Sequence, residues 1–289
     1  MARVVVTEPP LVKIAAGIIT WRDGFALDNC LRSIAGVVDE IVIADGLIDG
    51  VEADGLPPFS DREQLDRISV EYGSTIWADR WPSQSAQRDW TLQAARMLGC
   101  DWLLAIDADE ELMNPRALRP WLEVWHWDAF PLPFYFTDTE AAHPAAFKCL
   151  RVGSWRRYVC QGSFLENMAG EVVQVNGQTA WRGARESGMP YLVHRPELRP
   201  LERQTIRLSE SEVALEPYPE NVKVWQEPVY TPALLAPTGE ILPGSLEEAH
   251  RLGFPIWYCN GCGARYAGPG SCTRGHAPIG LAPLEVAAA

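Results

Sequence analysis

Short apolar runs alternate with amphipathic segments over the first 110 residues of the chain. Apolar runs rich in β-branched residues predict strands, whereas apolar residues at three- and four-residue spacing predict helices. The predicted strands cover residues 12–19, 37–46, 74–77 and 102–106, and the predicted helices cover residues 26–34, 62–70 and 85–98. Strands and helices in alternation are typical of a parallel sheet with right-handed crossovers. The sequence therefore predicts an α/β fold with a mostly parallel sheet flanked by helices.

The second half of the chain has a different pattern. Aromatic and β-rich segments predict further strands at residues 130–137, 147–152 and 171–175. Six prolines between residues 216 and 243 are too closely spaced for regular structure. We expect an α/β domain over residues 1–214, a proline-rich connector over residues 215–250 and a small C-terminal module over residues 251–289.

The composition is that of a globular protein. With 289 residues, 47% of them hydrophobic, the chain is large enough to bury a substantial core. Its formal net charge of -13 argues against the broad basic surface that non-specific nucleic-acid binding requires. No apolar stretch approaches the roughly 18–20 residues that span a bilayer, and the N-terminal residues lack the pattern of a signal peptide. We expect a soluble cytoplasmic protein without a membrane span.

The apolar run at residues 102–106 ends in four acids, Asp107, Asp109, Glu110 and Glu111. Parallel sheets bind ligands at the carboxyl ends of their strands, where Asp107 and Asp109 would share a divalent cation. An alternative is that the acids begin the next helix, whose first turn favours negative charge. We expect Glu110 to lie near the metal ion and Glu111 to be such a helix-start acid.

Four stretches share the order and spacing of one enzyme family. They are residues 18–23 with 30–34, residues 38–46, the Gln-Arg-Asp-Trp segment at 87–90 and the Asp-Ala-Asp-Glu segment at 107–110. They resemble the first strand and helix, the second strand, the Arg-Asn segment and the metal motif of the family 2 glycosyltransferases. The resemblance covers about the first 200 residues. It implies that residues 1–214 form a Rossmann-like GT-A domain that binds a nucleotide sugar.

The resemblance assigns roles to residues near the ends of the predicted strands. Asp45 matches the acid that hydrogen-bonds the nucleotide base, and Thr20 lies in the first loop of the nucleotide pocket. Arg88 matches a basic residue that holds the diphosphate. The alternative for Arg88 is an arginine on a helix surface. Asp107 and Asp109 would hold Mn²⁺ or Mg²⁺ against the diphosphate and neutralise the leaving nucleoside diphosphate.

Other positions agree with the family pattern or depart from it. His194, followed by Arg199 and Arg203, resembles a late histidine with trailing arginines. This histidine would complete the metal site as a neutral imidazole, or would simply end a strand. The family's Gly-Ser-x-Asp turn is absent after the second strand, where Asp49 is the replacement acid, and Asp89 stands where the family has asparagine.

An inverting transfer needs a carboxylate that deprotonates the acceptor hydroxyl. We predict Glu166 as this base, because its segment resembles an acceptor-side segment of the family. Glu110 and Glu140 are competitors, and a surface role for Glu166 is equally consistent with the sequence.

A second group of candidate ligands lies near the carboxyl terminus. Cys259, Cys262, Cys272 and His276 have the spacing C-x2-C-x9-C-x3-H. Two close pairs of thiolate or imidazole ligands are typical of a tetrahedral structural zinc site, which stabilises a module too small for a core of its own. The alternative is three cysteines without a ligand beside a histidine. The other four cysteines are scattered, so we expect no disulfide framework.

These observations predict a metal-dependent glycosyltransferase that moves a sugar from a nucleotide-diphosphate donor to an unidentified glycan, protein or modified nucleic acid. The resemblance implies inversion at the sugar carbon. The expected cofactors are Mn²⁺ or Mg²⁺ and a structural Zn²⁺. The alternative is a catalytically silent protein of the same fold, whose zinc module recognises protein or nucleic acid. Intact Asp107 and Asp109 favour the enzyme, and the altered turn after Asp45 favours the silent protein.

Overall fold

An eight-stranded sheet forms the centre of the molecule, in the strand order β3-β2-β1-β4-β7-β6-β11-β5. Its strands are β1 (Ile14–Thr20), β2 (Glu40–Asp45), β3 (Thr75–Ala78), β4 (Trp102–Asp107), β5 (Glu110–Met113), β6 (Ala129–Phe136), β7 (His143–Arg151) and β11 (Tyr191–His194). The first four strands in this order are parallel, whereas β7 is antiparallel to both of its neighbours. This computed structural model describes residues 12–51, 55–124, 128–136, 143–160, 164–174, 189–204, 206, 223–224, 257–258, 265–266 and 280–281.

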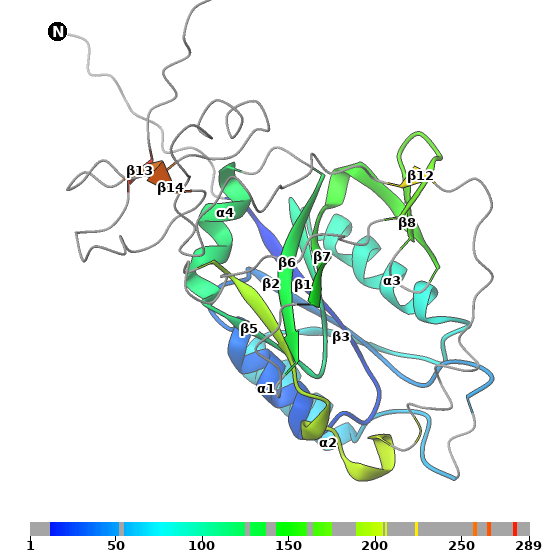
Figure 1. Cartoon of the computed structure of the whole chain (residues 1–289). Coiled ribbons are helices and arrows are strands. Elements are labelled where there is room, and N and C mark those ends of the chain that lie inside the picture. Colours follow the sequence, from blue (N-terminus) through cyan, green and yellow to red (C-terminus); the bar gives the residue numbers. More distant parts are fainter. Residues whose placement is uncertain are drawn as a thin grey trace, which may run out of the picture.

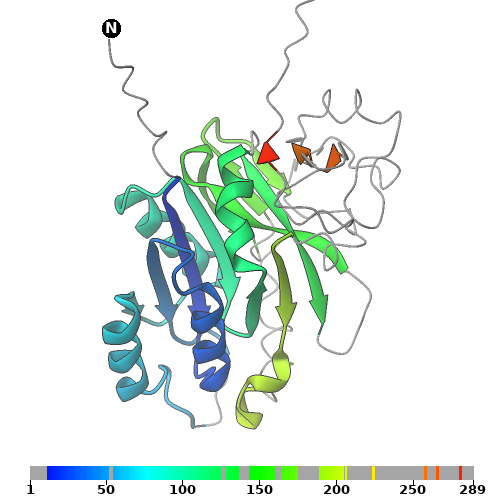
Figure 2. The ribbon, with the colours of Figure 1, turned by 90° about the vertical axis from the view of Figure 1, so that its left-hand side faces the viewer.

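Both faces of this sheet are covered (Figures 1 and 2). The helices are α1 (Phe25–Ile34), α2 (Arg62–Tyr72), α3 (Gln84–Met97) and α4 (Leu118–Val124), with short 3-10 helices at Pro115–Ala117, Val152–Ser154 and Pro196–Leu198. Side chains alternate between the faces along each strand. Ile14 and Ile18 of β1 therefore pack with α1, α2 and α4, whereas Ala15 packs with α3 and a second sheet.

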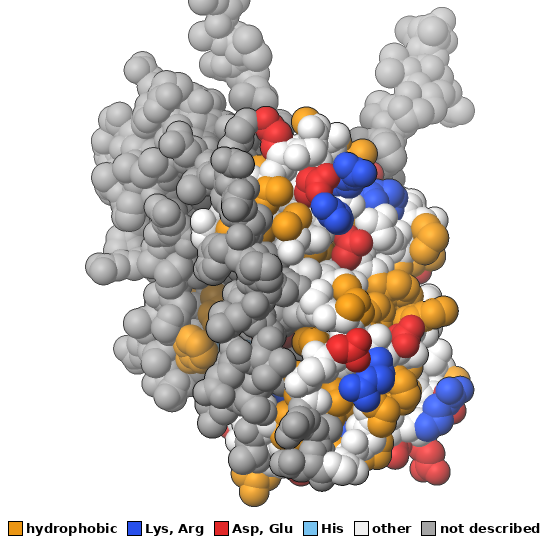
Figure 3. All heavy atoms as spheres, turned by 90° about the vertical axis from the view of Figure 1, so that its right-hand side faces the viewer, with side chains coloured by type: hydrophobic (Ala, Val, Ile, Leu, Met, Phe, Trp, Pro, Cys, Tyr) orange, Lys and Arg blue, Asp and Glu red, His pale blue; other side chains and the backbone are white. Residues whose placement is uncertain are grey.

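Two smaller sheets accompany the main one. The second sheet has the order β12-β10-β9-β8, and the third has the order β14-β13-β15. Their strands are β8 (Trp155–Cys160), β9 (Phe164–Asn167), β10 (Val172–Gln174), β12 (Lys223–Val224), β13 (Trp257–Tyr258), β14 (Arg265–Tyr266) and β15 (Gly280–Leu281). On the face that carries α3 and β8, basic, acidic and hydrophobic side chains are interspersed (Figure 3). No helix in the described part of the chain is long and apolar enough to cross a membrane.

The elements predicted for the first 110 residues are confirmed, with end points that differ by a few residues. Local capping explains two helix starts. The Asp61 side chain accepts a hydrogen bond from the Gln64 N–H at the start of α2, and the Ser83 hydroxyl accepts one from the Ala86 N–H at the start of α3. Such side-chain caps satisfy N–H groups that have no partner within the helix. Gly73 ends α2 in the left-handed conformation.

The expectation that Glu111 begins a helix is wrong. Glu110 and Glu111 begin strand β5, which pairs antiparallel with β11, and α4 begins only at Leu118. Short acidic segments favour a helix start by local charge alone. Here the main-chain hydrogen bonds to a strand about 80 residues later in the sequence prevail over that local preference.

Gly17 allows α3 to lie close to β1. A Cβ atom at this position would be 2.7 Å from Leu103 Cδ1 and 2.7 Å from Thr91 Oγ1. Thr91 is 2% exposed and Leu103 is fully buried, so neither side chain can move aside without displacing other core atoms. The close approach of α3 to the sheet therefore depends on the glycine.

We expect Gly17→Ala to lower the free energy of unfolding by roughly 1–3 kcal/mol, the usual effect of overpacking a core. Urea denaturation followed by circular dichroism measures this change. Gly153→Ala is the matched control, because no atom lies within 4 Å of its Cβ position and its backbone is outside the left-handed region. An unchanged unfolding midpoint for Gly17→Ala would contradict the packing of α3 on β1.

Candidate functional site

The carboxyl ends of β1, β2 and β4 meet at one edge of the main sheet. The parallel registers pair Thr20 with Asp45 and Ile19 with Asp107. Ligand sites of α/β proteins lie at this edge, outside the ends of the parallel strands. Three residues that the sequence analysis assigned to the donor site thus lie on adjacent strand ends.

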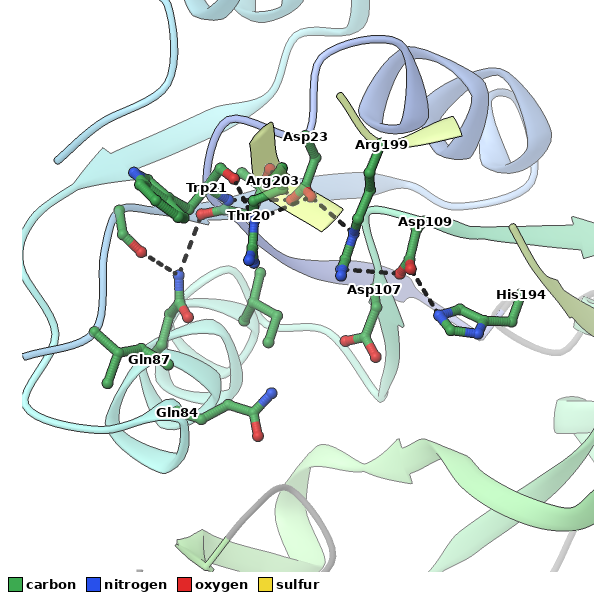
Figure 4. A pocket seen from close by; sticks show the side chains of 13 residues that line it. Thr20, Trp21, Asp23, Gln84, Gln87, Asp107, Asp109, His194, Arg199 and Arg203 are labelled. Atoms are coloured by element: carbon green, nitrogen blue, oxygen red, sulfur yellow. Dashed lines mark hydrogen bonds and ion pairs between the residues drawn. The ribbon is translucent and has the colours of Figure 1, made fainter. Parts of the chain in front are cut away.

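A pocket opens at this edge (Figure 4). Its volume of about 130 Å³ is below the roughly 300–1,000 Å³ typical of small-molecule pockets. The lining residues are Ile19, Thr20, Trp21, Asp23, Gly46, Ile48, Gln84, Gln87, Asp107, Asp109, His194, Arg199 and Arg203. The pocket therefore brings together polar side chains from both ends of the predicted α/β domain.

Arg199 lies between two buried acids of the pocket (Figure 4). Its guanidinium nitrogens are 2.9 Å from Asp23 Oδ1 and 3.1 Å from Asp109 Oδ1, and both acidic side chains are only 1% exposed. The Thr20 hydroxyl donates a hydrogen bond of 2.8 Å to Asp23, and Arg203 Nε lies 3.6 Å from the same carboxylate. Because an unpaired buried carboxylate is unfavourable, these contacts hold both acids in place.

Asp109 and His194 form a close pair. The antiparallel register of β5 and β11 puts His194 opposite Glu110, the residue after Asp109. The distance from His194 Nε2 to Asp109 Oδ2 is 2.6 Å. Burial alone would raise the pKa of Asp109, but the contacts with His194 and Arg199 outweigh it and lower that pKa below its usual value. Asp109 is therefore an anion at neutral pH.

Asp107 is held by two basic side chains that do not line the pocket. Arg88 Nη2 on α3 lies 2.6 Å from Asp107 Oδ1, and Lys148 Nζ on β7 lies 3.2 Å from Asp107 Oδ2. Burial would raise the pKa of Asp107, but Arg88 and Lys148 outweigh it and hold that pKa well below its usual range. The contact of Arg88 with a diphosphate stays a prediction. The sequence does not mark Lys148, because no local motif surrounds it.

Asp45 ends β2 but does not line the pocket. It is fully buried, and its carboxylate accepts hydrogen bonds from the Ser60 hydroxyl and from the Ser60 N–H, the latter at 3.0 Å. Burial raises the pKa of Asp45 to about 6, although the bonds from Ser60 oppose this rise. The predicted contact of Asp45 with a nucleotide base stays a prediction.

Gln87 is a pocket residue to which the sequence analysis gave no individual role. Its side-chain amide donates a hydrogen bond of 2.8 Å to the Ala44 carbonyl and makes longer contacts of 3.4 and 3.5 Å with the carbonyls of Thr20 and Gly46. The amide thus joins the first turn of α3 to the ends of β1 and β2. Its only signal in the sequence is its place in the Gln-Arg-Asp-Trp segment.

Glu166, the predicted base, lies on β9 outside the pocket lining. Its carboxylate oxygens are 2.9 Å from Arg156 Nη1 and 2.7 Å from Arg157 Nε. The hydrogen bond from Arg157 is the main reason that the pKa of Glu166 is lowered. A catalytic role for Glu166 stays a prediction. The competing residue Glu140 lies outside the described residues.

The three predicted Mn²⁺ or Mg²⁺ ligands share the pocket but do not fit a metal ion as they are arranged. A Mg²⁺ site requires ligand atoms that converge on one point at about 2.0–2.1 Å. Here His194 contacts Asp109 directly, and Asp107 faces Arg88 and Lys148. In the described part of the chain, no group of three His, Cys, Asp or Glu side chains could hold a metal ion. Metal dependence stays a prediction.

The predicted zinc ligands Cys259, Cys262, Cys272 and His276 lie outside the described residues. Strands of the third sheet border them in the sequence. Tyr258, which precedes the first cysteine, pairs with Arg265 of β14 and with Gly280 of β15. The strand ends on both sides of Cys259 and Cys262, and the strand start after His276, therefore lie at one end of this small sheet, whereas Tyr266, which precedes Cys272, pairs with Trp257 at the other end.

No protein-family model and no curated protein matches the chain. Among solved structures, S. aureus TarS residues 1–349 gives a TM-score of 0.39 at 12% identity, over 72% of this chain and 67% of that chain. The same fragment in complex with UDP-GlcNAc gives 0.36 at 12% identity, over 49% and 46%. A 4-diphosphocytidyl-2C-methyl-D-erythritol synthase gives 0.30 at 14% identity, over 71% and 87%. The match spans only 29% of another TarS chain. Similarity at this level establishes neither a shared fold nor a shared function.

The raised pKa of Asp45 predicts a pH-dependent stability. The folded state keeps a proton on Asp45 up to about pH 6, whereas the unfolded chain releases it near 3.8. This stabilising contribution is fully present below about pH 4 and is lost as the pH rises through about 6. One pKa unit corresponds to about 1.4 kcal/mol. The unfolding free energy of wild type minus that of Asp45→Asn should therefore fall by roughly 2–3 kcal/mol between pH 4 and pH 7.

Urea denaturation of both proteins at several pH values measures this difference. The comparison removes most of the contribution of the other acids, because they are common to the two proteins. A difference that does not change with pH would mean that Asp45 has the same pKa in the folded and unfolded states.

Proposed function

We propose that the protein is a glycosyltransferase that uses a nucleotide-diphosphate sugar as its donor. One observation carries the proposal: Thr20, Asp107, Asp109, His194 and Arg199 line a single pocket at the carboxyl edge of the parallel strands. These residues belong to three separate segments that resemble family 2 glycosyltransferases. A shared donor site requires such segments to meet in space, and they meet at the edge where α/β sheets bind their ligands.

Arg199 and Arg203 are the groups that we propose to hold the diphosphate. Both line the pocket, with side chains 11% and 9% exposed. Guanidinium groups bind phosphate oxygens through two parallel N–H donors. Asp23 and Asp109 orient Arg199 before the nucleotide arrives, so little side-chain freedom is lost on binding.

The proposed reaction transfers the glycosyl group to an acceptor hydroxyl. A carboxylate takes the hydroxyl proton, the acceptor oxygen bonds to the anomeric carbon, and the bond from that carbon to the diphosphate oxygen breaks. Negative charge then develops on the leaving nucleoside diphosphate, where Arg199 and Arg203 stabilise it. Attack opposite the leaving group would invert the configuration, as the family resemblance implies.

We also propose that Cys259, Cys262, Cys272 and His276 hold one structural zinc ion. Their spacing is that of two ligand pairs. The pairing of Tyr258 with both Arg265 and Gly280 supports the proposal, because it brings the chain on both sides of Cys259 and Cys262 close to the chain that follows His276.

Calorimetric titration with UDP, GDP and dTDP tests the donor site. We expect one of them to bind, and we expect Arg199→Gln to weaken that binding by about 10-fold or more, because a charged hydrogen-bond donor to the diphosphate is lost. Arg199→Lys keeps the charge and should lose less. Affinity for the corresponding nucleoside, which has no phosphate, should not change.

Arg157→Gln is the matched control, since this arginine lies on β8 outside the pocket and is 59% exposed. It should leave nucleotide affinity unchanged. The proposal fails if no nucleoside diphosphate binds, or if Arg199→Gln binds as tightly as wild type.

Elemental analysis of the protein, purified without chelators, tests the zinc site. We expect about one zinc ion per chain, because four ligands close one tetrahedral site. Cys262→Ser should lose the zinc, whereas Cys100→Ser should keep it, since Cys100 is a buried free thiol of the α/β domain. Zinc that remains bound to Cys262→Ser would contradict the assignment.

A further inference from the structure

Lys148 is a buried cation at the end of β4. Its side chain is 11% exposed, and its ammonium nitrogen lies 3.2 Å from Asp107 Oδ2 and 2.9 Å from the Glu110 carboxylate. It reaches this position from β7, which runs antiparallel beside β4. The glycosyltransferase resemblance gives Lys148 no role, although Lys148 contacts an acid that the resemblance assigns to the metal ion.

Lys148 and Arg88 together satisfy Asp107. Arg88 occupies one carboxylate oxygen at 2.6 Å, and Lys148 faces the other. Glu110 joins the group, because its carboxylate contacts Lys148 and also accepts a hydrogen bond of 2.9 Å from the Asp107 N–H. Two acids and two bases thus contact one another without any added ion.

A divalent cation would disturb this arrangement. Bound to Asp107, it would lie within a few ångströms of the Lys148 ammonium and the Arg88 guanidinium, and like charges repel more strongly between such largely buried groups than in bulk water. A metal ion could bind in this position only if the Lys148 ammonium moved away from both Asp107 and Glu110. A buried ammonium without an acidic partner is unfavourable. Displacement of Lys148 by a metal ion would therefore cost free energy and oppose metal binding.

Two guanidinium groups are part of the pocket itself. Arg199 and Arg203 line it, and Arg199 lies between Asp23 and Asp109 (Figure 4). A diphosphate entering the pocket therefore meets two guanidinium groups that could bind it directly. These guanidinium groups offer a source of charge compensation for the nucleotide other than a metal ion at Asp107.

We propose that Lys148 takes the place of a divalent metal ion at Asp107, so that the protein binds its nucleotide diphosphate without a divalent metal. The proposal rests on the proposed donor site. In this proposal, the Asp107 carboxylate binds the side chains of Arg88 and Lys148 in place of a metal ion. Lys148 is a positioning residue, because it acts through Asp107 and Glu110.

Manganese binding to the nucleotide-free protein tests the proposal independently of the donor. Electron paramagnetic resonance counts the bound Mn²⁺. Wild type should bind none at Asp107, whereas Lys148→Met should gain about one Mn²⁺ per chain, because Asp107 and Glu110 lose a cation. Lys148→Arg restores the charge and should again bind none. Arg157→Met, which removes a cation on β8, is the matched control and should behave as wild type.

Nucleotide titrations in EDTA and in Mn²⁺ give the second measurement. Wild type should bind its nucleoside diphosphate in EDTA and in Mn²⁺ with affinities that agree within about threefold, a difference of about 0.65 kcal/mol. Lys148→Met should bind about 10-fold more weakly in EDTA and recover in Mn²⁺. A merely structural role for Lys148 would weaken binding without any recovery by the metal.

Two results would overturn the proposal. One is a Mn²⁺ ion bound to wild type and lost in Asp107→Asn, and the other is nucleotide binding by wild type that disappears in EDTA and returns with Mn²⁺. Both leave the proposed donor site intact. Failure of every nucleotide to bind would instead contradict the proposed donor site. The number of Mn²⁺ ions bound by wild type and by Lys148→Met would then still show whether Lys148 takes the place of a metal ion at Asp107. If Lys148→Met does not fold, the wild-type measurements still decide.

Discussion

Buried carboxylates need partners of opposite charge, and this requirement organises the edge of the sheet where β1, β2 and β4 end. The acids there are Asp23, Asp107, Asp109 and Glu110, and their basic partners are Arg88, Lys148, Arg199 and Arg203. The acidic side chains at this edge are largely buried, with exposures between 1% and 24%, so most of their charge is balanced by the protein itself. The resulting ion pairs fix the first loop, the turn after β4 and the segment after β11 relative to one another. A polar pocket with oriented charges is the consequence.

The basic partners come from segments that are far apart in the sequence. Arg88 is on α3, Lys148 is on β7, and Arg199 follows β11. The pocket is therefore complete only when the strands after β4 have joined the sheet. In particular, β11 must pair with β5 before His194 can contact Asp109. The second half of the α/β domain thus contributes to the same site as the first half, and the site is a property of the whole main sheet.

Hydrophobic patterning was sufficient to predict β1 to β4 and α1 to α3, because each of these elements buries one face or both faces and is bounded by a cap, a turn or a cluster of acids. It was insufficient for Glu110 and Glu111. Their local sequence suits a helix start, and only the partner strand β11 makes them a strand. The same limit applies to Lys148, whose importance comes from a neighbouring strand and not from any residue near it in the sequence.

By itself, the sequence determined the alternation of strands and helices, the acids at the end of β4 and the polar residues at the ends of β1 and β2. These features are local, since they depend on periodicity and on residue types within one segment. Only the tertiary structure decided which charges meet: Asp107 with Arg88 and Lys148, and Asp109 with His194 and Arg199. The physical reason is that a buried charge selects its partner by distance in space, and strand pairing sets that distance.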